Sequence, residues 1–453
     1  MKNSVGAARH DGDTAGMTDT LFPLPDANAR PGQTSSEPRV QRPNRAQLEL
    51  RPVDLDGLLP ADHRARVVWE FVEGLDLAAL YDQIKAVEGH AGRPPIDPAI
   101  LMALWLYATL DGVGSARALA RLCDEHDAYR WLCGGVSVNY HTLADFRVEH
   151  ETVLDGLLTT SVAALMEEGV VTLTRVAHDG MRVRASAGAA SFRGGDRLEQ
   201  VLAEATAQVE ALKREVHDDP AATTRRQAAA RVRAAEERRQ RVARALAEVP
   251  AVAARRKKAR VDGPARVSTT APEARVMKMA DGGFRPAFNA QLTTATGSQV
   301  IVGVDVTTAG NDLSQLPPMM DQLERRYGQG PKEVLVDGGF VNLDDIRTLA
   351  AGCGARVYAP PNTRRGRGRH PYQRPDDEVI AEWRQRMGTP AAQAIYKERA
   401  ATSECVNAIA RNRGLQRLMV RGVTKARAVL LWFALAHNVL RAVSLRRLAE
   451  QLA

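Results

Sequence analysis

A heptad-spaced apolar stripe in the middle of the chain restricts its fold more than any other feature of the sequence. Its first part alternates steps of four and three residues through Leu198, Leu202, Ala205, Val209, Leu212 and Val216, which places these side chains on one face of a helix. Asp218-Asp219-Pro220 interrupts the stripe, and Val232, Ala235, Val242, Leu246 and Val249 resume it, with Arg239 at one expected core position. Two helices joined by a short turn are predicted to pack as an antiparallel hairpin. We expect this hairpin to occupy residues 191–264.

The segments on either side of the hairpin have different periodicities. Residues 47–168 have helical apolar spacing and predict an all-helical N-terminal domain, preceded by a polar tail over residues 1–46 that we expect to be disordered. From about Val170 short β-rich segments alternate with helical ones, and a clear hairpin signal joins Phe288–Ala295 to Gln299–Val306. Residues 169–190 and 265–445 therefore predict one α/β domain with a mixed sheet, interrupted by the helical hairpin.

Composition excludes several classes of protein. Of 453 residues, 44% are hydrophobic and 26% are charged, which excludes a wholly disordered chain. The four cysteines form no CxxC pair, which argues against a disulfide scaffold and a zinc module. We find no signal peptide, and the longest apolar runs, such as Ala99–Leu110, are shorter than the roughly 20 residues that span a bilayer. We expect a cytoplasmic globular protein without a membrane partner.

The net charge of +8 is concentrated in one part of the chain. Residues 211–260 contain fifteen Lys and Arg against six Asp and Glu, a local balance of +9, so the rest of the chain is about neutral. A basic block of this kind is typical of a nucleic-acid partner. A solvated helical face is the more common explanation of a charge run taken alone.

Three carboxylates stand at positions suited to metal chemistry. Asp179 follows a predicted strand and precedes Gly180, and Asp337 ends the apolar strand that begins at Glu333 and precedes two glycines. Such oxygen ligands are those that Mg²⁺ prefers. Glu404 lies in a predicted helix with cations on both sides. Taken singly, each aspartate with its glycine is more often an ordinary turn, and the glutamate alone is more often a surface residue in a salt bridge.

Together these pieces resemble the DDE transposases of bacterial insertion sequences. The resemblance covers about residues 47–445. The matching motifs, in chain order, are GRPPIDP at Gly92–Pro98, NYHTLADFR at Asn139–Arg147, HDG at His178–Gly180, the FNAQ to ND segment from Phe288 to Asp312, VDGGF at Val336–Phe340 and Y-x2-R-x4-E-x6-R from Tyr396 to Arg411. Relatives usually carry a Pro-x-Phe-Gly-like stretch after the glutamate and a Lys seven residues beyond it, where this chain has Cys405-Val406-Asn407-Ala408 and Arg411.

The resemblance implies an RNase H-like catalytic domain after a helical DNA-binding domain. Asp179, Asp337 and Glu404 correspond to the catalytic triad, which holds two Mg²⁺ or Mn²⁺ ions; Glu398 is the reserve candidate for the third position. Tyr396, Arg399 and Arg411 match residues that assist DNA contact. Independently of the family, Arg255, Arg256, Lys257 and Lys258 at the end of the hairpin are candidate phosphate-binding residues.

The function expected is that of an insertion-sequence transposase. It would bind the inverted repeats of its element as a homodimer on double-stranded DNA, near the nucleoid, and perform two-metal cleavage and strand transfer at element ends and target. The alternative is a catalytically inactive, transposase-derived DNA-binding protein. An unrelated metal-dependent nuclease is a third hypothesis, which the helical N-terminal domain and the basic hairpin disfavour.

Overall fold

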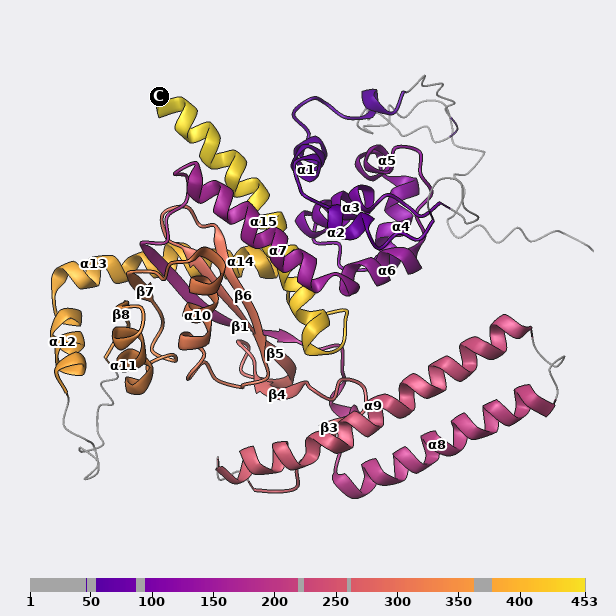
Figure 1. Cartoon of the computed structure of the whole chain (residues 1–453). Coiled ribbons are helices and arrows are strands. Elements are labelled where there is room, and N and C mark those ends of the chain that lie inside the picture. Colours follow the sequence, from indigo (N-terminus) through magenta and orange to yellow (C-terminus); the bar gives the residue numbers. More distant parts are fainter. Residues whose placement is uncertain are drawn as a thin grey trace, which may run out of the picture. The chain divides into compact units, whose positions relative to one another are not determined.

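The computed structural model describes residues 46, 54–86, 94–218, 224–258, 262–361 and 377–452. The chain divides into two units, Met1–Pro52 and Val53–Ala453, and every helix and strand named below belongs to the second. The tail expected to be disordered lies outside the described residues, apart from Ala46. A mixed α/β fold is confirmed (Figure 1).

The first part of this unit is helical. Within the described residues its α-helices are α1 (Arg64–Glu73), α2 (Ala78–Tyr81), α3 (Pro98–Leu110), α4 (Ala116–Glu125), α5 (Asp127–Cys133), α6 (Tyr140–Glu149) and α7 (Glu151–Glu167), preceded by a 3₁₀ turn (Asp56–Leu58). Helix α3 is apolar on all sides because it is buried on nearly all sides. Asp97 caps its first turn, and the proline at position 98 needs no backbone N–H donor there.

A mixed sheet forms the centre of the second part. Its strands are β1 (Arg175–Arg184), β4 (Arg275–Lys278), β5 (Phe284–Ala295), β6 (Ile301–Thr307), β7 (Glu333–Leu335) and β8 (Arg356–Tyr358). The order is β4-β5-β1-β7-β8, and β6 also pairs with β5. Strands β1, β7 and β8 are parallel, whereas β5 is antiparallel to β1, β4 and β6. The hairpin predicted from the sequence is therefore confirmed as β5 and β6.

The helices that follow the sheet strands are α10 (Leu316–Tyr327), α11 (Leu343–Ala351), α12 (Glu378–Met387), α13 (Pro390–Arg399), α14 (Cys405–Asn412) and α15 (Val423–Leu452), with a π-helical turn at Ala400–Glu404. Helix α15 packs on β6 and on α3, α6 and α7. Asn438 of α15 accepts a hydrogen bond from the backbone N–H of Ile301 and donates one to its carbonyl, both at 2.8 Å, so the helix satisfies the backbone of the edge strand.

Helix α15 is also long and apolar enough to cross a membrane, by length and composition alone. It is the one such helix among the described residues, and 67% of its most apolar window is buried inside the protein. A core helix has these same properties. Its packing on the sheet and on α7 explains its apolar composition.

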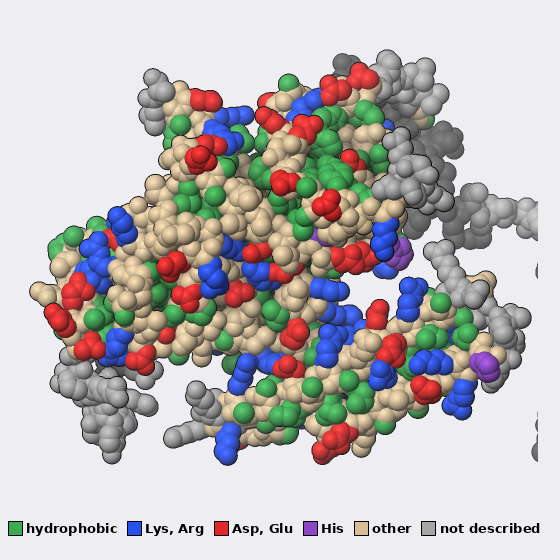
Figure 2. All heavy atoms as spheres, viewed as in Figure 1, with side chains coloured by type: hydrophobic (Ala, Val, Ile, Leu, Met, Phe, Trp, Pro, Cys, Tyr) green, Lys and Arg blue, Asp and Glu red, His purple; other side chains and the backbone are tan. Residues whose placement is uncertain are grey.

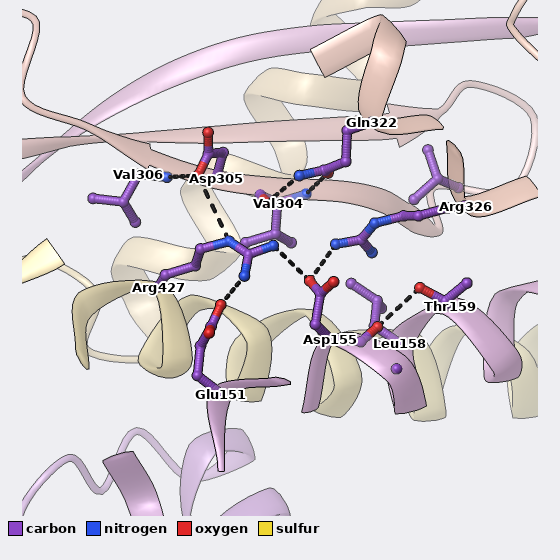
Figure 3. Close-up of polar contacts among 12 residues, drawn as sticks. Glu151, Asp155, Leu158, Thr159, Val304, Asp305, Val306, Gln322, Arg326 and Arg427 are labelled. Atoms are coloured by element: carbon purple, nitrogen blue, oxygen red, sulfur yellow. Dashed lines mark hydrogen bonds and ion pairs between the residues drawn. The ribbon is translucent and has the colours of Figure 1, made fainter. Parts of the chain in front are cut away.

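An ionic network of partly buried side chains ties the helical part to the sheet (Figure 3). Arg427 of α15 forms ion pairs with Glu151 and Asp155 of α7 and, at 3.6 Å, with Asp305 of β6. Arg326 of α10 joins the same Asp155 carboxylate. The side chains are between 6% and 45% exposed, so loss of a single partner leaves a partly buried charge uncompensated. The network therefore links α7, α10 and α15 to strand β6.

Between β1 and β4 the chain forms two long helices, α8 (Gly195–Asp218) and α9 (Arg225–Lys258), which pack against each other. Leu198, Ala205 and Val209 of α8 and Ala235 and Val242 of α9 are buried, as the heptad stripe predicts. The short strands β2 (Phe192–Arg193) and β3 (Val267–Ser268) pair antiparallel where the chain enters and leaves the two helices. The predicted turn at Asp218-Asp219-Pro220 lies largely outside the described residues.

Candidate active site

Strand pairing brings the first two predicted carboxylates together. Strands β1 and β7 are parallel, with Ala177 opposite Leu335. Asp179 lies two residues beyond this pair in β1, and Asp337 lies two residues beyond the last residue of β7. The negative charge of Asp337 raises the pKa of Asp179, so the two carboxylates lie close together. The two aspartates, 158 positions apart in the sequence, are therefore neighbours.

Asp179 lies in a restricted environment. Its carboxylate accepts hydrogen bonds from the N–H of Gly180 at 2.9 Å and from Nδ2 of Asn407 at 3.0 Å, and it lies 3.7 Å from Nη1 of Arg399. Only 15% of the side chain is exposed. Burial, and then the negative charge of Asp337, raise the pKa of Asp179 to about 6, although Arg399 opposes the shift. A bound cation would offset both the burial of Asp179 and its repulsion by Asp337, so a carboxylate pair of this kind favours cation binding.

In the metal-free protein we expect Asp179 to titrate near pH 6 instead of near its ordinary value of 3.8. Because the folded pKa is the higher one, the folded state binds more protons between about pH 4 and 6 and loses stability as the pH rises through that range. Metal binding needs the ionised form, so Mn²⁺ affinity should fall by up to about tenfold per unit below pH 6. Carboxyl ¹³C NMR of Asp-labelled protein measures this pKa directly. The Asp337→Asn variant should lower it; titration near pH 4 in both proteins would contradict the interpretation.

Glu404 is linked to the two aspartates through an arginine. Its side chain is about half exposed, at the end of the π-helical turn, and forms an ion pair with Arg399. Arg399 is itself 14% exposed and contacts Asp179 as well, so one guanidinium bridges two of the three predicted carboxylates. The reserve candidate, Glu398, instead accepts a hydrogen bond from Nη1 of Arg175 at 2.6 Å. Glu404 is therefore the better placed of the two glutamates.

The carboxylate oxygens of the candidate triad suit a hard divalent cation, but Glu404 is paired with Arg399. Asp179 and Asp337 offer carboxylate oxygens close enough for the charge of Asp337 to raise the pKa of Asp179, and such oxygens are the ligands that Mg²⁺ prefers. Within the described part of the chain, however, no three His, Cys, Asp or Glu side chains are grouped as metal ligands. Glu404 is directed to Arg399 and would have to leave that partner to complete the set.

Two buried polar residues at this site carry no role in the sequence prediction. Asn407, three residues after Glu404, holds Asp179, and its own Oδ1 is buried without a hydrogen-bond partner among the described residues. Asp312 is buried beside β1, where it accepts from Nδ2 of Asn289 at 2.7 Å and pairs with Arg182 at 2.8 Å. The sequence could have indicated only Asn407, because it lies three residues after Glu404 and positions i and i+3 share a helix face.

His178 is a structural residue. It is fully buried, and its two ring nitrogens lie 2.9 Å from Oγ1 of Thr293 and from Oε1 of Gln291 on β5. Burial lowers the pKa of His178 to about 4, so the ring is neutral near pH 7. With both nitrogens occupied, the imidazole supports the pairing of β1 with β5 and does not act as a general base.

Gly180 is required by the close approach of Asp312. A Cβ added at position 180 would lie 2.2 Å from Oδ1 of Asp312 and 2.7 Å from Nε2 of Gln291. Since those groups are buried and mutually bonded, Gly180→Ala should lower the free energy of unfolding by about 1–3 kcal/mol. Urea unfolding followed by circular dichroism measures it. Gly156→Ala, on an exposed face of α7 with no atom within 4 Å, is the control and should be neutral or slightly stabilising. Equal stability of both variants would contradict the steric argument.

The remaining predicted DNA-binding residues fall into two groups. Tyr396 lies beside Arg399, whose Cζ is 5.9 Å from the ring centroid, and Arg411 is exposed on α14. Arg255, Arg256, Lys257 and Lys258 form the end of α9. Arg255 donates to Oγ1 of Thr308 at 3.2 Å and Arg256 to the carbonyl of Asp262. Figure 2 shows that Lys and Arg side chains along the two hairpin helices are interspersed with Asp and Glu.

Two family models match the chain. A transposase domain (DUF772) matches residues 53–149, and a transposase DDE domain matches residues 260–440. No match was found among curated proteins or among solved structures. The matched DDE span contains Asp337 and Glu404 but begins after Asp179, whose strand β1 nonetheless lies between β5 and β7 of the same sheet. With both transposase domains matched over more than half of its length, the chain belongs to the DDE transposases of insertion sequences.

Proposed function

We propose that this transposase binds the terminal inverted repeats of its own element and cleaves and joins DNA there with two divalent metal ions, Mg²⁺ or Mn²⁺. Asp179, Asp337 and Glu404 are the ligands in this proposal. When bound, the ions activate a water or a DNA 3′-hydroxyl and stabilise the leaving oxygen. The observation that carries the proposal is the parallel register of β1 and β7, which makes neighbours of two aspartates from distant parts of the sequence.

The protein residues around the triad have distinct roles in this proposal. Asn407 and the N–H of Gly180 hold the Asp179 carboxylate in one orientation. Arg399 neutralises Asp179 and Glu404 in the metal-free protein, and Tyr396 limits the positions open to its guanidinium. Once the carboxylates bind metal, Arg399 is the cation placed to contact the scissile phosphate.

The domain assignment belongs to the same proposal. Residues 47–168 form the helical DNA-binding domain, residues 169–190 and 265–445 form an RNase H-like catalytic domain, and residues 191–264 form the basic hairpin. The mixed sheet with β1 at its centre supports the catalytic assignment. A homodimer on DNA and a location at the nucleoid are further parts of it. The alternative of a non-catalytic DNA-binding derivative is not favoured, because all three carboxylates are present.

A plasmid that carries the DNA on both sides of this gene tests the proposal. Short inverted repeats should flank the reading frame, and purified protein with Mn²⁺ should nick the plasmid at their outer ends. Primer extension maps the nicks. Binding without cleavage in either metal would instead support the non-catalytic alternative.

A further inference from the structure

A hollow whose charged lining residues are mostly cations lies next to the candidate triad. It has a volume of about 610 Å³, and Gly180, the residue after Asp179, forms part of its wall. Five Lys and Arg side chains line it, from β1, β4, β5 and α14, against one carboxylate, Asp281. No aromatic side chain lines it. The cations are Arg182, Arg184, Lys278, Arg285 and Arg411.

A second hollow lies beside the first, toward the helical part of the protein. Its volume is about 500 Å³, and it lies between the turn that follows α3 and the segment that follows α14. Arg411, Leu415 and Gln416 line both hollows, so the two are adjacent. Three more arginines, Arg147, Arg413 and Arg417, line the second part, against the single carboxylate of Asp111. We call the two hollows together the basic groove.

The backbone around the basic groove is closely packed. Gly112 and Gly414 both have positive φ, and a Cβ on Gly414 would lie 3.1 Å from the carbonyl oxygen of Gly112. The segment after α14 also pairs with the end of β1, because Arg184 donates its N–H to Gln416 at 3.1 Å and accepts from Leu418 at 2.8 Å. The wall of the groove is thus attached to the strand that carries Asp179.

Six of the eight cations in the basic groove form no ion pair with a described residue, and four of these six are exposed. Arg182 is paired with Asp312 and Arg285 with Asp281. In contrast, Arg184, Lys278, Arg411 and Arg417 are exposed and form no ion pair with any residue in the described ranges. Four like charges around one concave surface repel one another, and a polyanion would relieve that repulsion.

We propose that the basic groove binds the phosphate backbone of duplex DNA and guides it from the helical part to Asp179. This inference rests on the proposed function only for the identity of the ligand. The extent of the groove and the origin of its cations in several chain segments suit a repeating row of phosphates better than a single small anion. Its lack of aromatic side chains argues against single strands, whose bases stack on such groups.

The test is a variant of the full-length protein with Arg184, Lys278 and Arg417 replaced by Ala. All three are exposed and unpaired, so the fold should be retained. The control replaces Lys85, Arg325 and Arg447, which are also exposed and remove the same charge outside the groove. Affinity for a fluorescent 30-base-pair duplex, measured in EDTA across a salt series, should show a slope of log K against log salt that is flatter by about 2–3 for the groove variant. The control should change it little.

Lysine footprinting locates the contact. Duplex DNA should protect Lys278 from acetylation and leave Lys85 reactive, as measured by mass spectrometry. Equal slopes in the two variants, or equal acetylation of Lys278 with and without DNA, would overturn the proposal. If the groove variant loses its slope but the wild type cleaves no DNA with Mn²⁺, the groove stands and the catalytic proposal fails. If the wild type cleaves and the slopes are equal, the groove fails alone.

Discussion

Replacing Asp337 by Ala is expected to lower the rate of DNA cleavage by at least about 1000-fold, which is about 4 kcal/mol of transition-state stabilisation. Binding to element ends should change by no more than about threefold. The reason for the separation is local: the side chain of Asp337 accepts a hydrogen bond from the N–H of Gly339, its charge acts on Asp179, and it does not line the basic groove. Removal of one metal ligand abolishes the chemistry without removing a phosphate contact.

Gel-shift and cleavage assays on the same protein preparation measure the two quantities. Asp321→Ala is the matched control, because Asp321 is exposed on α10 and has no role in the site; its cleavage should equal that of the wild type. Should Asp337→Ala lose binding and cleavage to the same extent, the carboxylate would be serving the fold or the DNA contact, and the assignment as a metal ligand would be wrong.

The second large effect is expected at the end of the hairpin. Replacing Arg255, Arg256, Lys257 and Lys258 by Ala should flatten the slope of log K against log salt by up to about 3–4, for specific and non-specific DNA alike. Each lost phosphate contact removes about 0.9 from the slope. Arg255 and Arg256 also donate hydrogen bonds to Thr308 and Asp262, so fewer of their N–H groups are available to phosphates. We therefore expect a change in slope at the lower end of this range.

The competing explanation is that the hairpin serves dimerisation and its charges only maintain solubility. In that case the quadruple variant keeps its salt slope, and substitutions at Leu202, Val209 and Leu212 change the oligomeric state, as sedimentation would show. The structure adds a physical constraint, since Val209 is buried in the contact with α9. Polar substitutions there would first separate the two helices, so circular dichroism must accompany the sedimentation experiment.

The fold could be predicted wherever the deciding pattern was local. The heptad stripe that includes Leu198 and Val242 needs only neighbours three and four residues away, and these residues pack as that spacing requires. The β5–β6 hairpin was predictable for the same reason. Helix α15 shows the limit of composition, because an apolar helix that packs on β6 and one that spans a bilayer have similar sequences.

The three carboxylates could be named from the sequence, through their motifs, but their surroundings could not. The parallel pairing of β1 with β7 brings Asp179 and Asp337 within electrostatic reach of each other across 158 positions, to which no local pattern points. The same holds for Asn407 on Asp179 and for Asp312 above Gly180. Sequence by itself determined which residue types were available and the secondary structure that carries them. Only the tertiary structure decided which charges meet, because burial and the pairing of distant strands set the pKa of Asp179, the bridging place of Arg399 and the course of the basic groove.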